Sequence, residues 1–186
     1  MKIGFAMCGS FCTHADAIDV LRQLVREHEI VPILSGNAAG TDTRFGRSAE
    51  LRAGLNRLTG RDAITTIAEA EPLGPREPLD ALLICPCTGN TLAKLAGGIT
   101  DGPVTMAAKA HLRADRPLVL ALASNDAMSA NLGNIGNLLN RKNIYFVPMK
   151  QDAPEEKPHS LVADFSLVLP ALEAALTGKQ LRPLFR

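Results

Sequence analysis

Short apolar runs alternate with stretches of helical periodicity along the whole chain. The runs that best fit buried strands are Lys2 to Cys8, Ile30 to Ser35, Asp80 to Cys85, Pro117 to Ala123 and Ile144 to Pro148, with Ile64 to Ile67 as a further candidate. Strands that alternate with helices are typical of βα units wound around a parallel sheet. The pattern therefore predicts an α/β fold, a single Rossmann-like three-layer domain with a mainly parallel sheet.

Three stretches between or after these strands have the spacing of amphipathic helices. Ala15 to Glu27 carries apolar residues on one helix face, Leu132 to Leu139 behaves similarly, and Leu167 to Leu176 fits a closing helix. Glu71 to Pro78 contains three prolines and a glycine, and Ala153 to Ser160 is polar, so both are predicted to be loops.

Length and composition limit the number of domains and the kinds of partner that this chain can have. A chain of 186 residues with 46% hydrophobic residues suits one domain, residues 1–186. Its 20 basic residues nearly cancel its 19 acidic ones, and no basic cluster attracts nucleic acid or an anionic membrane. Only six residues separate Lys2 from Gly9, too few for the apolar region of a signal peptide, and no run has membrane-spanning length. We expect a cytoplasmic protein that acts on small molecules or with other proteins.

The chain contains four cysteines, whose spacing can be compared with that of metal ligands and of disulfides. Cys8 and Cys12 are separated by three residues, and Cys85 and Cys87 by one. Neither pair is joined by histidines at ligand spacing, so no metal site is expected. The thiols are expected to be reduced and to pack as small hydrophobic side chains.

Small polar residues follow the predicted strands, at the sheet edge where open α/β proteins bind ligands. After the first strand, Gly9, Ser10 and Phe11 lead into a helix whose N-terminus suits an anion. This turn lacks the G-x-G-x-x-G fingerprint and the lysine of a P-loop, which disfavours a conventional NAD or nucleoside triphosphate site. Taken alone, it is equally well explained as a helix cap.

Similar residues follow three later strands. Ser35 begins a Ser-Gly-Asn turn, and Ser124 and Asn125 follow the fourth strand. The strongest segment is Cys85 to Thr91, in which small and polar residues interrupt an apolar pattern just before a helix. Its side chains and the helix N–H groups can bind a phosphate or the edge of a heterocycle.

The stretch PCTGNTLAKLAGGITD, Pro86 to Asp101, resembles the PASANT motif of a flavoprotein superfamily. That superfamily includes peptidyl-cysteine decarboxylases, phosphopantothenoylcysteine decarboxylase and prenyl-flavin synthases. Within it, KIGFAMCGSFCT, NAAGTDTRFG, VTMAAKAHLR and NIGNLLNRKNIYFVP are similar to the family of dipicolinate synthase B subunits.

The resemblance implies that the chain binds flavin mononucleotide (FMN). The residues that it assigns to the cofactor are Gly9, Ser10, Phe11, Ser35, Thr88, Gly89, Asn90, Thr91, Ser124 and Asn125. Two departures concern decarboxylation: Glu69 to Pro78 lacks the histidine that decarboxylases carry before the motif, and Asp126 stands where their PxMNxxMW motif has its asparagine. No catalytic residue is assigned.

The resemblance also implies a role in making dipicolinate from a cyclic dicarboxylate of the lysine pathway during sporulation, an oxidation. It implies a separate A subunit with its own NADP site, and a homo-oligomer of trimeric type. Arg44, Lys109 and Arg113 are candidate partners of the substrate carboxylates, with solvated surface charge as the other interpretation. The alternatives are an independent FMN-dependent decarboxylase or flavin-modifying transferase, and a subunit that only stabilises the A chain.

Overall fold

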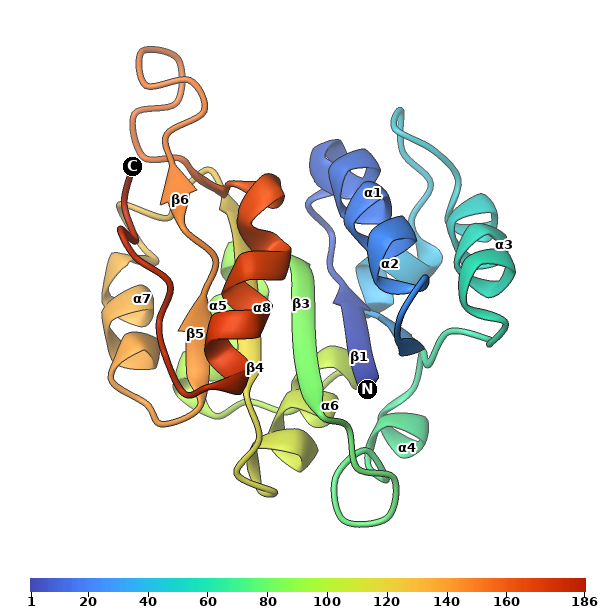
Figure 1. Cartoon of the computed structure of the whole chain (residues 1–186). Helices are drawn as coiled ribbons and strands as arrows, with labels where there is room; N and C mark the ends of the chain where they lie inside the picture. The colour runs from blue at the N-terminus through green and yellow to red at the C-terminus, as the bar shows by residue number, and fades with distance from the viewer.

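The computed structural model describes all residues, 1–186, and shows one twisted sheet between two layers of helices (Figure 1). The strands are β1 (Lys2–Met7), β2 (Glu29–Leu34), β3 (Ala81–Cys87), β4 (Leu118–Ser124), β5 (Ile144–Phe146), β6 (Met149–Lys150) and β7 (Leu161–Ala163). The parallel part has the order β2-β1-β3-β4-β5. The last two residues of β4, Ala123 and Ser124, pair instead with the antiparallel strand β7. Strand β7 in turn pairs with β6. The predicted α/β fold with a mainly parallel sheet is confirmed.

The helices connect successive strands and cover both faces of the sheet. They are α1 (His14–Leu24), α2 (Gly36–Gly40), α3 (Ser48–Thr59), α4 (Ile67–Ala70), α5 (Gly89–Gly97), α6 (Pro103–Leu112), α7 (Leu132–Leu139) and α8 (Val168–Leu176), with short 3-10 turns at Phe11–Thr13 and Phe165–Leu167. None of the helices combines the length and the apolar character that a bilayer crossing requires.

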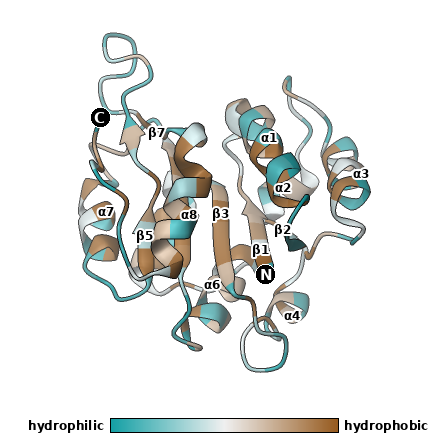
Figure 2. Ribbon diagram, in the orientation of Figure 1, coloured by the Kyte–Doolittle hydropathy of each residue, from teal (hydrophilic) through white to brown (hydrophobic).

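Two separate apolar clusters hold these layers on the sheet. Ile3, Phe5 and Met7 of β1 pack with α1 and α8 on one face, whereas Ala6 of the same strand packs with α5, α6 and α7 on the other. Alternate residues of a strand point to opposite faces, so one apolar run supplies both layers. The inner strands are accordingly the most uniformly hydrophobic ribbons in Figure 2.

The expected strand at Ile64 to Ile67 is wrong. Ile64 makes only an isolated bridge to Ile33 at the sheet edge. Ile67 already belongs to α4, because Thr66 caps that helix and the Glu69 carboxylate accepts a hydrogen bond from the Thr66 backbone N–H at 3.0 Å. This capping box ends the extended backbone before a strand can form.

Candidate functional site

A polar cavity of about 220 Å³ lies beyond the carboxyl ends of β1, β2 and β3. The loop after β1 forms one wall, and the first residues of α2, α5 and α6 form the others. Its lining residues are Gly9, Ser35, Gly36, Asn37, Thr88, Asn90, Thr91, Lys94, Asp101, Gly102, Pro103, Val104 and Thr105. Five residues predicted from the sequence to hold a flavin are therefore brought together: Gly9, Ser35, Thr88, Asn90 and Thr91.

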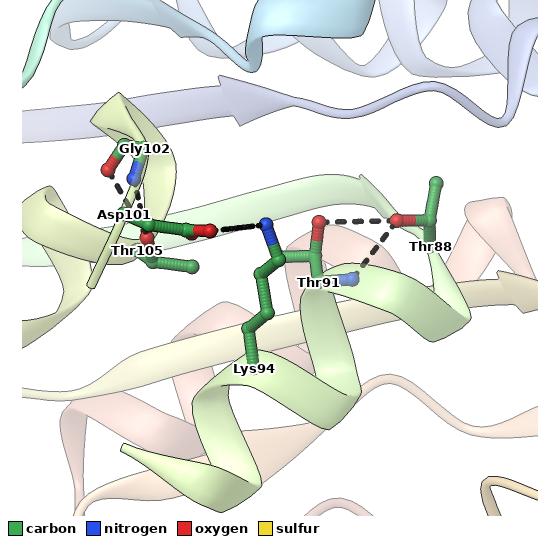
Figure 3. A network of polar contacts seen from close by, with 6 residues as sticks. All are labelled: Thr88, Thr91, Lys94, Asp101, Gly102 and Thr105. Carbon is green, nitrogen blue, oxygen red and sulfur yellow. Dashed lines mark hydrogen bonds and ion pairs between the residues drawn. The ribbon is translucent and has the colours of Figure 1, made fainter. Parts of the chain in front are cut away.

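The start of α5 is held by a chain of hydroxyl contacts (Figure 3). The Thr88 side chain accepts a hydrogen bond from the Thr91 backbone N–H at 3.1 Å and donates to the Thr91 hydroxyl at 3.0 Å. The Thr91 hydroxyl in turn donates to the buried Cys8 sulfur at 3.3 Å. Both hydroxyl hydrogens are thus used inside the protein. These threonines therefore shape the cavity, and their oxygens can only accept hydrogen bonds from a ligand.

Donors for a ligand come from other groups around the same cavity. Asn90 is exposed and takes no part in the contacts between Thr88 and Thr91. The backbone N–H groups of Gly89 and Asn90 lie in the first turn of α5, where no intrahelical acceptor exists. The Ser35 hydroxyl accepts from the Ala38 N–H at 3.2 Å and keeps its own hydrogen for another partner. This set of amides and a hydroxyl suits phosphate and polyol oxygens.

One ion pair lies on the opposite wall. The Lys94 ammonium, from the second turn of α5, contacts both carboxylate oxygens of Asp101 at 2.9 and 2.8 Å (Figure 3). The hydrogen bond from Lys94 is the main reason that the pKa of Asp101 lies below its usual value. Asp101 directly precedes α6, where the Thr105 hydroxyl accepts from the Gly102 N–H and donates to the Gly102 carbonyl. The pair joins the body of α5 to the start of α6.

Gly89 is buried behind the cavity, and its position explains a second polar cluster. A Cβ atom added there would lie 2.5 Å from the Ser124 Oγ, 2.7 Å from the Asn131 Nδ2 and 2.7 Å from the Asp126 Oδ1. Ser124 and Asn131 both donate to this Asp126 oxygen, the latter at 3.0 Å. Glycine is required at position 89 because the loop after β4 packs directly on the start of α5.

Three other residues predicted to bind the cofactor are not part of the cavity lining. The Ser10 hydroxyl donates to the Ala123 carbonyl at 2.7 Å, which ties the loop after β1 to the end of β4. The Asn125 side chain accepts from the buried Ser160 hydroxyl at 3.4 Å. Phe11 lines a separate groove of about 390 Å³ between α1, the 41–47 loop and α3.

His14 stands between the cavity loop and this groove. Its ring centroid is 5.1 Å from that of Phe11, and its Nε2 lies 2.8 Å from the Cys8 carbonyl oxygen. Burial lowers the pKa of His14, and the Cys8 carbonyl opposes that effect. A neutral imidazole at neutral pH is the result.

The three basic residues proposed for substrate carboxylates do not line the cavity. Arg44 is exposed, with its guanidinium carbon 4.8 Å from the centroid of the Phe45 ring. Lys109 and Arg113 are exposed at the far end of α6, where Lys109 lies about 9 Å along the helix axis from Pro103. Their assignment to the substrate stays a prediction.

The cysteines do not assemble a metal centre. All four thiols are free, and Cys8, Cys85 and Cys87 are buried whereas Cys12 is exposed. Burial raises the pKa of Cys8 to about 11 and also raises those of Cys85 and Cys87 well above their usual value. No group of three or more His, Cys, Asp or Glu side chains lies together in a way that could hold a metal ion.

Residues 1–164 match the Flavoprotein family. The chain belongs to this family. It is 45% identical to the dipicolinate synthase B subunit of Bacillus subtilis (strain 168) over 184 residues, which is 98% of this chain and 92% of that protein. The crystal structure of the dipicolinate synthase B subunit from Bacillus halodurans C superposes with a TM-score of 0.91, at 39% identity, over 100% of this chain and 95% of that one.

The chain is also similar to the FMN-dependent cysteine decarboxylase SpaF. Its structure matches with a TM-score of 0.66 and 26% identity, over 95% of each chain. The predicted membership of the flavoprotein superfamily and the resemblance to dipicolinate synthase B subunits are both confirmed.

Sequence reasoning missed Lys94, Asp101 and the start of α6 as parts of the cavity wall. A signal for Lys94 was present, because it follows Thr91 by three residues and residues at that spacing share a helix face. Asp101 has a weaker signal, since it precedes Gly102 and Pro103, a pair typical of a helix start. Nothing in the sequence indicates that this start faces α5.

Proposed function

We propose that this chain acts as the B subunit of dipicolinate synthase. In this role it takes part in oxidising a cyclic dicarboxylate of the lysine pathway, dihydrodipicolinate or its hydrated precursor, to dipicolinate during sporulation. The observation that carries the proposal is the 45% identity to the Bacillus subtilis protein over 98% of the chain. Because the match spans nearly the whole chain, it includes the segments that form the cavity.

The cavity is the proposed binding site for the polar part of FMN. Its volume of about 220 Å³ falls below the roughly 300 to 1,000 Å³ that enclose a whole drug-sized ligand. The amides of Asn37 and Asn90, the Ser35 hydroxyl and the first turn of α5 match the oxygen-rich phosphate and ribityl chain. Gly9 and Gly36 bring backbone to the same space without a side chain. The residues therefore fit the group, and a bound flavin supplies an acceptor for hydride.

The size of the cavity also supports a homo-oligomer. The flavin ring would extend beyond the enclosed space, and only 4% of the residues are aromatic and able to wall it. A second copy of the chain is expected to complete the site, in an assembly of trimeric type. Light scattering at micromolar concentration tests this, and a monomer would count against it.

The complete activity is proposed to need a separate A subunit that binds NADP. Purified chain, purified A subunit and their mixture would each be assayed for dipicolinate formation, with the flavin content of each sample measured. The proposal predicts a yellow B subunit and formation of dipicolinate by the mixture only. Formation by the A subunit alone at the rate of the mixture would contradict it.

The same assay distinguishes two other functions. An independent flavin-dependent decarboxylase or transferase would be yellow and would not raise dipicolinate formation by the A subunit. A subunit that only stabilises its partner would be colourless yet needed in the mixture. The decarboxylase function lacks two of its expected side chains, since no histidine lies within Glu69 to Pro78 and Asp126 replaces an asparagine.

A further inference from the structure

The cavity holds one basic and one acidic side chain, and they are paired with each other. Among its lining residues, Lys94 is the only cation and Asp101 the only anion. Both oxygens of the Asp101 carboxylate lie within 2.9 Å of the Lys94 ammonium. Figure 3 shows the Lys94 chain running past Thr91 to reach the carboxylate at the start of α6.

This pairing conflicts with the charge of the proposed ligand. A phosphate monoester carries between one and two negative charges at neutral pH, comparable to a phosphorylated side chain. Lys94 is the only side chain of this cavity that can neutralise that charge, and Asp101 would repel it while the two remain paired. A phosphate must therefore either forgo a counter-charge or take Lys94 from Asp101.

We infer that Lys94 exchanges partners, leaving Asp101 for the phosphate when a phosphorylated ligand enters the cavity. In the free protein Asp101 holds the lysine in place and competes with the ligand. The inference rests on the proposed FMN site and names the residue pair that sets its preference for a phosphorylated over an unphosphorylated flavin.

The geometry makes this exchange easy. The Lys94 and Asp101 side chains are 31% and 55% exposed, so the pair is solvated and easily separated. A released Asp101 regains water and stays beside the N-terminus of α6, where negative charge is favourable. The lysine exchanges a carboxylate with one negative charge for a phosphate that carries between one and two, and it forms charge-assisted bonds with either group.

The test compares FMN with riboflavin, which lacks the phosphate. Both flavins would be titrated by fluorescence quenching against wild type, Lys94→Met, Lys94→Arg and Asp101→Asn, with circular dichroism to verify folding. Lys142 and Asp115 form an exposed pair at 3.1 Å elsewhere, so Lys142→Met and Asp115→Asn are the matched controls.

We expect Lys94→Met to weaken FMN binding by roughly tenfold or more and to leave riboflavin binding unchanged, since only the charged contact is lost. Lys94→Arg should restore most of the FMN affinity. Asp101→Asn should tighten FMN binding severalfold and leave riboflavin unaffected. Equal losses for both flavins in Lys94→Met, or weaker FMN binding by Asp101→Asn, would show that the pair only braces the wall and would overturn the inference.

A separate readout keeps the inference apart from the FMN proposal. Inorganic phosphate would be titrated while the NMR signals of the Lys94 side chain are followed. If wild type binds phosphate through Lys94 but binds no FMN, the proposed function fails and the partner exchange stands. If wild type binds FMN and Lys94→Met binds it equally well, the exchange fails and the proposed function stands. If wild type binds neither phosphate nor FMN, the partner exchange and the proposed function both fail.

Discussion

Gly89 and Ser124 lie so close that a single methyl group cannot be placed between them. A Cβ atom at residue 89 would be 2.5 Å from the Ser124 Oγ, well inside van der Waals contact. The contact links the motif segment at the start of α5 to the last residue of β4. It therefore determines how the first turn of α5, with its free N–H groups, is presented to the cavity.

Gly89→Ala should destabilise the protein by about 1 to 3 kcal/mol, the usual cost of overpacking a closely packed site. Urea unfolding followed by circular dichroism measures this change. Gly136→Ala is the control, because Gly136 lies in α7 with nothing within 4 Å of an added Cβ. That variant should be stabilised by up to about 1 kcal/mol, since alanine favours a helix. Equal stability of Gly89→Ala and wild type would show that the loop gives way.

Stability should fall as the pH is lowered from 7.5 to 5.5, in part because of His111. This side chain is buried, its Nε2 lies 2.9 Å from the Pro117 carbonyl oxygen, and its Nδ1 has no partner. Burial lowers the pKa of His111, the Pro117 carbonyl opposes this, and Arg116 adds to it. In the unfolded chain this histidine binds a proton near pH 6.5, whereas in the folded chain it does so only at lower pH. Acidification therefore favours unfolding.

His111→Gln should reduce that dependence of the unfolding free energy on pH. Urea unfolding at several pH values between 5.5 and 7.5 provides the slope. The control is His159→Gln, which removes an exposed histidine in place of the buried one. An unchanged slope in His111→Gln would mean that this histidine binds a proton equally well in the folded and unfolded states, which would contradict the prediction.

Only one cysteine of the native protein should react rapidly with a thiol reagent. Cys12 is exposed, whereas Cys8, Cys85 and Cys87 are buried, with pKa values raised by burial. Thiolates are the reactive species, so the buried thiols are unreactive near neutral pH. Titration with a chromogenic disulfide should show one rapid thiol when native and four when unfolded.

The same burial predicts that Cys87→Ala alters packing and not chemistry. Dipicolinate formation by the mixture with the A subunit, and the flavin content, should stay near the wild-type values. Loss of turnover with intact folding and flavin content would assign a chemical role to this thiol.

Much of the fold could be predicted because each strand is a compact apolar run. The five main predicted strands are present with ends shifted by at most two residues, and the helix Leu132–Leu139 matches its predicted bounds. The helices at Ser48–Thr59 and Pro103–Leu112 were not predicted. Seven of the ten residues of the latter are buried, so it lacks the contrast between faces that reveals a helix in a sequence.

The cavity was predictable as far as the strand ends and no further. Ser35, Thr88 and Asn90 follow strands, and parallel strands bring their carboxyl ends to one edge. The pairing of Lys94 with Asp101 depends on a turn at Gly98, a residue with a φ of 71° that ends α5 and redirects the chain to α6. The direction of such a turn follows from tertiary packing, which no local pattern records.

A flavin titration of Asn90→Ala tests the proposed FMN site most directly. Asn90 is exposed at the cavity wall and supplies a donor and an acceptor that the chain itself does not use. Its removal should cost about 1 to 3 kcal/mol, equivalent to roughly 5- to 150-fold weaker FMN binding. Folding should survive, because no apolar volume is lost from the core.

FMN would be titrated by fluorescence quenching against wild type and variant at equal concentration, with circular dichroism as the check on folding. Asn140→Ala is the matched control, since Asn140 is an exposed asparagine that ends α7 away from the cavity lining. Wild type and the control should bind FMN tightly, and Asn90→Ala should bind it clearly more weakly. Equal affinity in all three proteins, or no FMN binding by wild type, would contradict it.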